Sequence, residues 1–223
     1  TYIETSQSEL SVGVSIEGAG ATSVIQSRIT AEWSPTITLI SGSEGTNGNQ
    51  SISYIKMDGS SATAWGAIYI AARSNVKIHH CTFSDFLHTA VIFNGKTAMY
   101  DPVAPSTYPT GNEFYNNTIT NCSEYTSYGS GALFVVGQNG MLIHDNTITQ
   151  NSRASRTNGY LIKYYNDGYN KGVKIYNNTL TKAPPVDNAE DWNFAIEFWY
   201  SQGGIEIYNN TIFGAVDLVV AQK

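Results

Sequence analysis

Hydrophobic and polar residues alternate over short segments of this chain, and one eight-residue version of the pattern occurs five times. Most copies begin with a hydrophobic, polar, hydrophobic, polar order, which is typical of a β-strand with one buried face. The pattern therefore predicts strands rather than helices. The five copies span residues 76–83, 112–119, 141–148, 173–180 and 205–212.

Each copy also contains a corner, which in four of the five is Asn or Asp followed by Asn and Thr. Asn tolerates left-handed backbone angles and can bond its own main chain, so it suits a tight turn. The second residue of the corner forms a column that we interpret as an internal ladder, in which amides of successive coils bond one another. The members of this column are Cys81, Asn117, Asn146, Asn178 and Asn210.

Weaker copies at residues 14–20 and 52–59 extend the repeat toward the N-terminus. One inward hydrophobic position then recurs every 26 to 36 residues, at Ile16, Ile52, Ile78, Phe114, Ile143, Ile175 and Ile207. A second strand segment lies between copies, at residues 66–70, 90–93, 131–135, 160–164, 194–198 and 216–220. Parallel stacking of such units produces a β-helix. We therefore predict an all-β fold, a single-stranded right-handed parallel β-helix (solenoid) of about seven coils with an internal Asn ladder.

The run Ile207-Tyr208-Asn209-Asn210-Thr211-Ile212 and its copies, preceded by residues 14–25, resemble the pectate-lyase-like superfamily of right-handed parallel β-helices. The resemblance covers nearly the whole chain. It implies the fold, but the superfamily includes lyases, hydrolases, epimerases, tailspikes and adhesins, so the resemblance does not select one activity.

Composition and charge narrow the class of protein. The 223 residues show no break in composition, so we expect one domain, residues 1–223. The formal net charge of −6 argues against a nucleic acid partner, because phosphate binding depends on clustered Lys and Arg. No apolar run approaches the roughly 20 residues that span a bilayer, so we expect no membrane partner.

The first residues, Thr1-Tyr2-Ile3, already have the character of a strand, and no signal peptide precedes them. We expect a piece of a larger protein that is secreted or lies at the cell surface. The coil edges at the two ends predict that neighbouring domains or subunits cover them. Cys81 and Cys122 fall at different offsets in adjacent coils, which predicts two free and buried thiols.

A column of outward rings lies just before the corner, formed by His79, Tyr115, His144, Tyr176 and Tyr208. With coils about 4.8 Å apart it would extend over roughly 19 Å, the length of a few sugar units. Each ring could then offer an apolar face to a sugar. The alternative is that the rings stack on one another and only stiffen the sheet.

A neighbouring outward column contains two adjacent opposite-charge pairs separated by Leu142, in the order Lys77, Glu113, Leu142, Lys174 and Glu206. On the other strand segment Lys163 lies beside Glu197. Adjacent opposite charges predict cross-strand salt bridges. The alternative is that a Lys near the histidines neutralises an acidic sugar.

The ring column supplies a candidate acid/base pair, with His79 or His144 as base and Tyr115 as acid. Asp145, a further candidate catalytic residue, stands next to His144, among amides at the equivalent positions of other coils. The superfamily members that use calcium stack several carboxylates there, so we expect no metal, apart from a weak calcium ion held by Asp145, Glu113 and loop oxygens. The paired-Asp, Gly-His-Gly and Arg-Ile-Lys signatures of the superfamily's polygalacturonases are absent.

Other candidate substrate-binding residues lie in loops: Arg153 and Arg156, which could meet a sugar carboxylate or sulfate, and Trp192. The sequence thus favours a carbohydrate-active β-helix that acts on an extracellular polysaccharide, as a lyase or a glycoside hydrolase, without a tightly bound cofactor. A non-catalytic polysaccharide-binding or adhesion module is the first alternative. A structural spike segment is the second.

Overall fold

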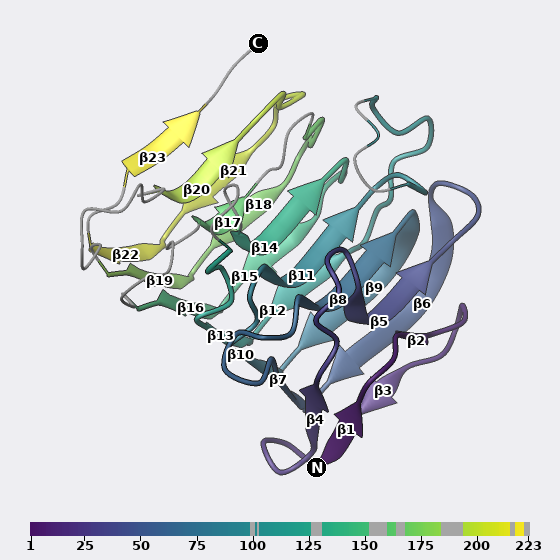
Figure 1. Ribbon diagram of the computed structural model, residues 1–223. Coiled ribbons are helices and arrows are strands. Elements are labelled where there is room, and N and C mark those ends of the chain that lie inside the picture. Colours follow the sequence, from purple (N-terminus) through teal and green to yellow (C-terminus); the bar gives the residue numbers. More distant parts are fainter. Residues whose placement is uncertain are drawn as a thin grey trace.

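The protein folds as a right-handed parallel β-helix, with its coils stacked along one axis (Figure 1). The computed structural model describes residues 1–98, 101, 103–125, 131–151, 160–163, 168–183, 194–214 and 217–220. All the regular elements in these ranges are β-strands, and none of them contains a helix that could cross a membrane. The predicted fold class is confirmed.

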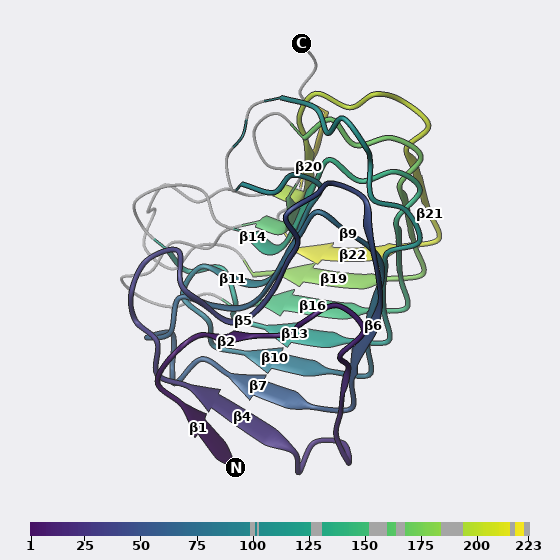
Figure 2. The ribbon, with the colours of Figure 1, turned by 90° about the vertical axis from the view of Figure 1, so that its right-hand side faces the viewer.

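Each full coil contributes one strand to each of three parallel sheets, A, B and C. Figure 2 shows the strands of sheet A as successive rungs from β1 to β22. Sheet A contains β1 (Tyr2–Glu4), β4 (Val24–Ser27), β7 (Lys56–Asp58), β10 (Thr82–Ser84), β13 (Thr118–Thr120), β16 (Thr147–Gln150), β19 (Thr179–Lys182) and β22 (Thr211–Gly214).

Sheets B and C complete each coil. Sheet B contains β2 (Ser8–Glu9), β5 (Pro35–Ile40), β8 (Gly66–Ala71), β11 (Thr89–Asn94), β14 (Gly131–Val136), β17 (Tyr160–Lys163), β20 (Phe194–Phe198) and β23 (Asp217–Val220). Sheet C contains β3 (Ile16–Glu17), β6 (Thr46–Ser53), β9 (Arg73–His79), β12 (Glu113–Tyr115), β15 (Leu142–His144), β18 (Lys174–Tyr176) and β21 (Glu206–Tyr208).

The inward hydrophobic position predicted from the repeat is confirmed strand by strand. Ile52 pairs with Ile78, Phe114 pairs with both Ile78 and Ile143, and the pairing continues to Ile207. These side chains join one continuous core along the axis, and the middle members of the column are fully buried. The register therefore fixes which residues of sheet C face outward.

A corner divides each repeat motif into two strands, one in sheet C and one in sheet A, which is why a coil has three strands rather than two. The first residue of the corner has a φ of 53° to 56° in five successive coils, at His80, Asn116, Asp145, Asn177 and Asn209. Asn and Asp adopt this left-handed conformation more readily than most residues, and this explains their repetition.

The second residue of the corner carries the Asn ladder. The Oδ1 of Asn146 accepts from the backbone N–H of Asn117 at 3.0 Å, and its Nδ2 donates to the carbonyl of Phe114 at 3.0 Å and to Asn178 at 2.9 Å. Asn117, Asn178 and Asn210 repeat the pattern. The ladder therefore satisfies buried backbone groups at the turn.

Both cysteines are free and buried, as predicted. Burial raises the pKa of the Cys81 thiol to about 11 and raises that of Cys122 as well. Both side chains therefore remain thiols at neutral pH and act as small core residues.

Candidate functional site

The ring column of His79, Tyr115, His144, Tyr176 and Tyr208 forms one continuous stack on the outer face of sheet C. The strand register pairs each ring with the next. Successive ring centroids are 4.9, 5.2, 4.7 and 5.0 Å apart, and successive planes differ by 22°, 7°, 6° and 2°. The predicted position of all five residues is therefore confirmed.

The expectation that each ring offers its face to a sugar is wrong. At these separations and angles, the faces of the inner rings lie against their neighbours. Their edges are left for contact with a ligand. Tyr208 is in the last strand of sheet C and is 41% exposed. The rings stack on one another because the spacing between coils is also a favourable stacking distance for aromatic rings.

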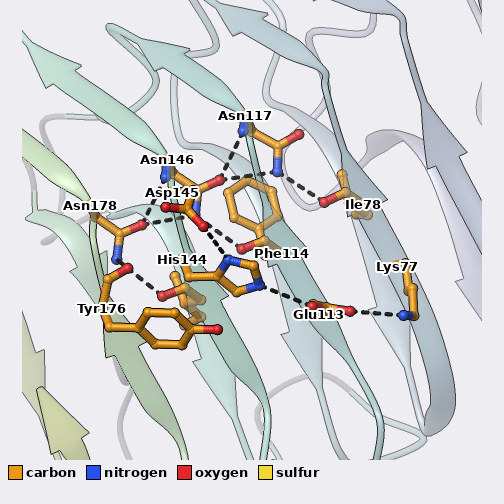
Figure 3. Close-up of polar contacts among 11 residues, drawn as sticks. Lys77, Ile78, Glu113, Phe114, Asn117, His144, Asp145, Asn146, Tyr176 and Asn178 are labelled. Carbon is orange, nitrogen blue, oxygen red and sulfur yellow. Dashed lines mark hydrogen bonds and ion pairs between the residues drawn. The ribbon is translucent and has the colours of Figure 1, made fainter.

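His144 lies between two carboxylates (Figure 3). Its Nε2 is 2.9 Å from Glu113 Oε1 in the preceding coil, and its Nδ1 is 2.7 Å from Asp145 Oδ2. Both ring nitrogens of His144 are therefore engaged by carboxylates, so neither is free to act as a base.

Glu113 is also bound to Lys77, whose Nζ lies 2.9 Å from its Oε2. Burial acts to raise the pKa of Glu113, but the hydrogen bonds from His144 and Lys77 outweigh it and the pKa is lowered. Glu113 is therefore ionised at neutral pH, so it is not a proton donor there.

His79 has a different environment from His144. Its Nδ1 is 2.9 Å from Nδ1 of His80, and its Nε2 has no hydrogen bond to any described residue. Burial, followed by the charges of His80 and Lys77, lowers the pKa of His79. A neutral imidazole with one unbonded nitrogen is the form that can accept a proton.

Tyr115 lies between the two histidines, as the sequence predicted. Burial and the nearby Glu113 carboxylate raise the pKa of its phenol, and its hydroxyl makes no hydrogen bond within the described ranges. Tyr176 resembles it, with a pKa raised by burial and by Tyr208. These hydroxyls are therefore protonated at neutral pH, and no described residue accepts a hydrogen bond from them.

All three predicted salt bridges form. Besides Lys77–Glu113, Lys174 lies 3.0 Å from Glu206 on sheet C, where both side chains are largely exposed. Lys163 lies 2.8 Å from Glu197 on sheet B, where both are buried. The alternative role, neutralising an acidic sugar, is weakened because each lysine already has a carboxylate partner.

The outer face of sheet B carries a second group of rings that the sequence did not indicate, close to the predicted Lys163–Glu197 pair. Trp65 and His88 are buried and stack at 4.1 Å, and Phe134 stacks on His88 at 5.3 Å. Nearby, the Lys163 ammonium lies 3.9 Å above the Tyr160 ring. The strands of sheet B are apolar on both faces, so alternation gave no signal of which residues face outward.

Glu113 and Asp145 do not fit a shared calcium ion. Each carboxylate binds a different nitrogen of His144, so the two lie on different sides of the imidazole ring and do not converge on one point (Figure 3). Within the described part of the chain, no three His, Cys, Asp or Glu side chains form a group that could hold a metal. Arg153, Arg156 and Trp192 lie outside the described residues.

The family described as a right-handed β-helix region matches residues 9–215. The chain belongs to this family. A search of curated proteins finds no matching sequence. Among solved structures, this β-helix resembles an alginate lyase from Paenibacillus sp. str. FPU-7, with 14% identity over 96% of this chain and 90% of that chain and a TM-score of 0.38.

A second similar structure is the A-module of the mannuronan C-5 epimerase AlgE4 of Azotobacter vinelandii. The identity is 12% over 96% of this chain and 82% of that chain, with a TM-score of 0.33. At such low identity both similarities concern the fold.

Proposed function

We propose that this β-helix binds an extracellular polysaccharide along the ring column of sheet C. The observation that carries the proposal is the stack itself: rings in five successive coils, with tyrosine hydroxyls at Tyr115, Tyr176 and Tyr208 that bond to no described residue. Unpaired hydroxyls that follow one straight column suit a polymer rich in hydroxyl groups. The stacked rings are already held by their neighbours, so their side chains lose little conformational entropy on binding.

A second candidate function is cleavage of the bound chain, with His79 as the base and Tyr115 as the acid. It is favoured by the lowered pKa of His79, its unbonded Nε2 and the raised pKa of the stacked Tyr115. In an elimination His79 would take the C5 proton of a uronate and Tyr115 would protonate the departing oxygen. In a hydrolysis His79 would instead take a proton from the attacking water.

Binding is tested by retention on insoluble polysaccharides and by affinity electrophoresis in gels that contain neutral, uronic or sulfated polysaccharides. We expect retardation by at least one of them. Tyr115→Phe and Tyr176→Phe keep the ring stack but remove a hydroxyl, so each should reduce the retardation. Tyr2→Phe on β1, in another sheet, should not change it. Retardation by none of the polysaccharides would contradict the proposal.

Cleavage is tested on the same polysaccharides by ultraviolet absorbance, which detects the unsaturated product of elimination, and by reducing ends, which both reactions release. His79→Gln and Tyr115→Phe should each lower the rate by about 100-fold or more, the usual contribution of a positioned acid or base. Tyr2→Phe, on β1 and away from sheet C, is the control, with no change in rate expected. Binding without product from any polysaccharide would leave the binding function and reject cleavage.

A further inference from the structure

The spacing of the ring column limits which polymers can lie along it. The four distances between successive ring centroids are 4.7 to 5.2 Å, and the rings remain nearly parallel throughout. The regularity follows from the parallel register, which places one ring in each coil. A polymer that places one monomer on each ring must advance by about the same distance per monomer.

Sugar linkages differ strongly in this advance. In a β-1,4-linked chain of pyranoses with equatorial bonds at both ends, each sugar is extended along the chain and advances by nearly one coil spacing. An axial bond, as in α-1,4-linked glucose, bends the chain, and β-1,3 linkages make it curve into a wide helix. Of these three linkages, only the extended β-1,4 ribbon can follow a straight row of five rings.

The order of side chains along the column also matches the repeat of a β-1,4-linked chain. The hydroxyls of Tyr115 and Tyr176 are two coils apart, with His144 between them, and its nitrogens are already bonded. In an extended β-1,4-linked ribbon successive sugars are turned over, so that every second sugar presents the same edge. The hydroxyls of Tyr115 and Tyr176 therefore meet equivalent groups of alternate sugars, and the hydroxyl of Tyr208, one coil beyond Tyr176, meets the opposite edge of the next sugar.

The charges beside the column indicate a neutral ligand. Lys77 and Lys174 are each paired with a carboxylate, at 2.9 and 3.0 Å, and the position between Glu113 and Lys174 is the apolar Leu142. Asp145 adds a further carboxylate. A polyanion would lie against carboxylates without an unpaired cation on the described part of this face, which costs desolvation and repulsion.

We propose that the ligand of the ring column is a neutral, extended β-1,4-linked glycan that places one sugar on each coil. This inference rests on the proposed function and specifies its substrate class. A neutral chain has no uronate group, so any cleavage on this face would be hydrolysis rather than elimination.

The test is isothermal titration of the whole chain with hexasaccharides of one length and different linkage: cellohexaose and mannohexaose, maltohexaose, laminarihexaose and a β-1,4-linked hexauronate. We expect the neutral β-1,4-linked pair to bind at least tenfold more tightly than the other three. Shorter β-1,4-linked oligosaccharides should gain affinity with each added sugar up to five, the number of rings, and then reach a plateau.

Tyr176→Phe should weaken binding of the β-1,4-linked hexasaccharide about three- to tenfold, as expected for one lost neutral hydrogen bond. Tyr2→Phe should leave it unchanged. Stronger binding of the α-linked, β-1,3-linked or acidic hexasaccharide overturns this inference and leaves the proposed function standing. If none of the hexasaccharides binds and no polysaccharide retards the protein, the proposed function itself fails.

Discussion

His144 shows how one side chain can be fixed by its neighbours in two coils. It stacks between Tyr115 and Tyr176 while both its nitrogens face carboxylates. Stacking sets the plane of the ring, and the two carboxylates set its rotation within that plane. The residue at the centre of the ring column is thus held in position with both nitrogens engaged, which favours a role in shaping the face over one in proton transfer.

We predict that Glu113→Gln lowers the free energy of unfolding by about 1 kcal/mol at pH 7, because it removes a carboxylate shared by Lys77 and His144. The folded-state pKa of Glu113 lies below its ordinary value of 4.5. Its contribution is therefore complete above pH 4.5 and is lost as the pH falls through the lowered value. Urea unfolding at a series of pH values should show the two proteins converging in acid.

Glu206→Gln is the matched control, since Glu206 pairs with an exposed lysine only. It should change stability little at any pH. A loss as large as that of Glu113→Gln would mean that the contact with His144 contributes nothing.

The Asn ladder is the element that keeps sheets A and C joined at a sharp corner. The side chain of an internal Asn bonds the backbone of the preceding coil twice: its amide nitrogen donates to a carbonyl there, and its amide oxygen accepts from a backbone N–H there. The side chain therefore links the turns of two coils. Because these groups are buried, water cannot easily replace the amide. The ladder thereby supports the strands that present the ring column.

We predict that Asn146→Ala lowers the free energy of unfolding by about 2–4 kcal/mol, since it leaves the buried N–H of Asn117 and the carbonyl of Phe114 without their partners. Asn210→Ala, in the last coil and only partly buried, should cost less than half as much. Urea unfolding measures both. Equal losses would contradict a ladder that works through burial.

The repeat predicted the register of sheet C, because Ile78, Phe114 and Ile143 recur at one offset and only one alignment buries them all. The register in turn placed the ring column and the charge pairs correctly. It could not give the direction of the ring faces, which depends on side-chain rotation. Nor could it show that Asp145, turned by its left-handed backbone, reaches His144.

At the scale of the whole molecule, the stack of coils has two ends where strands pair on one side only. Sheet A ends at β1 and β22. Apolar side chains are exposed there: Tyr2 is 72% and Ile3 53% exposed on β1, and Phe213 is 55% exposed on β22. Such edges are places where another chain can add strands.

We predict that this chain on its own associates as its concentration rises, through these edge strands. Sedimentation velocity over a range of concentrations should show a growing oligomer fraction. Ile3→Lys and Phe213→Lys should reduce it, because a charge at an edge opposes pairing. Val103→Lys, at a position 60% exposed in a loop, is the control. A monomer at every concentration would contradict the prediction.

The ring column also has a consequence for short ligands. Its surface nearly repeats itself after each coil, so a disaccharide can occupy several positions along the five rings with similar energy. The number of such positions contributes favourable entropy, and it falls as the oligosaccharide grows. Short fragments would therefore exchange rapidly among degenerate positions, whereas a long chain could shift by two coils and regain the same tyrosine contacts without leaving the protein.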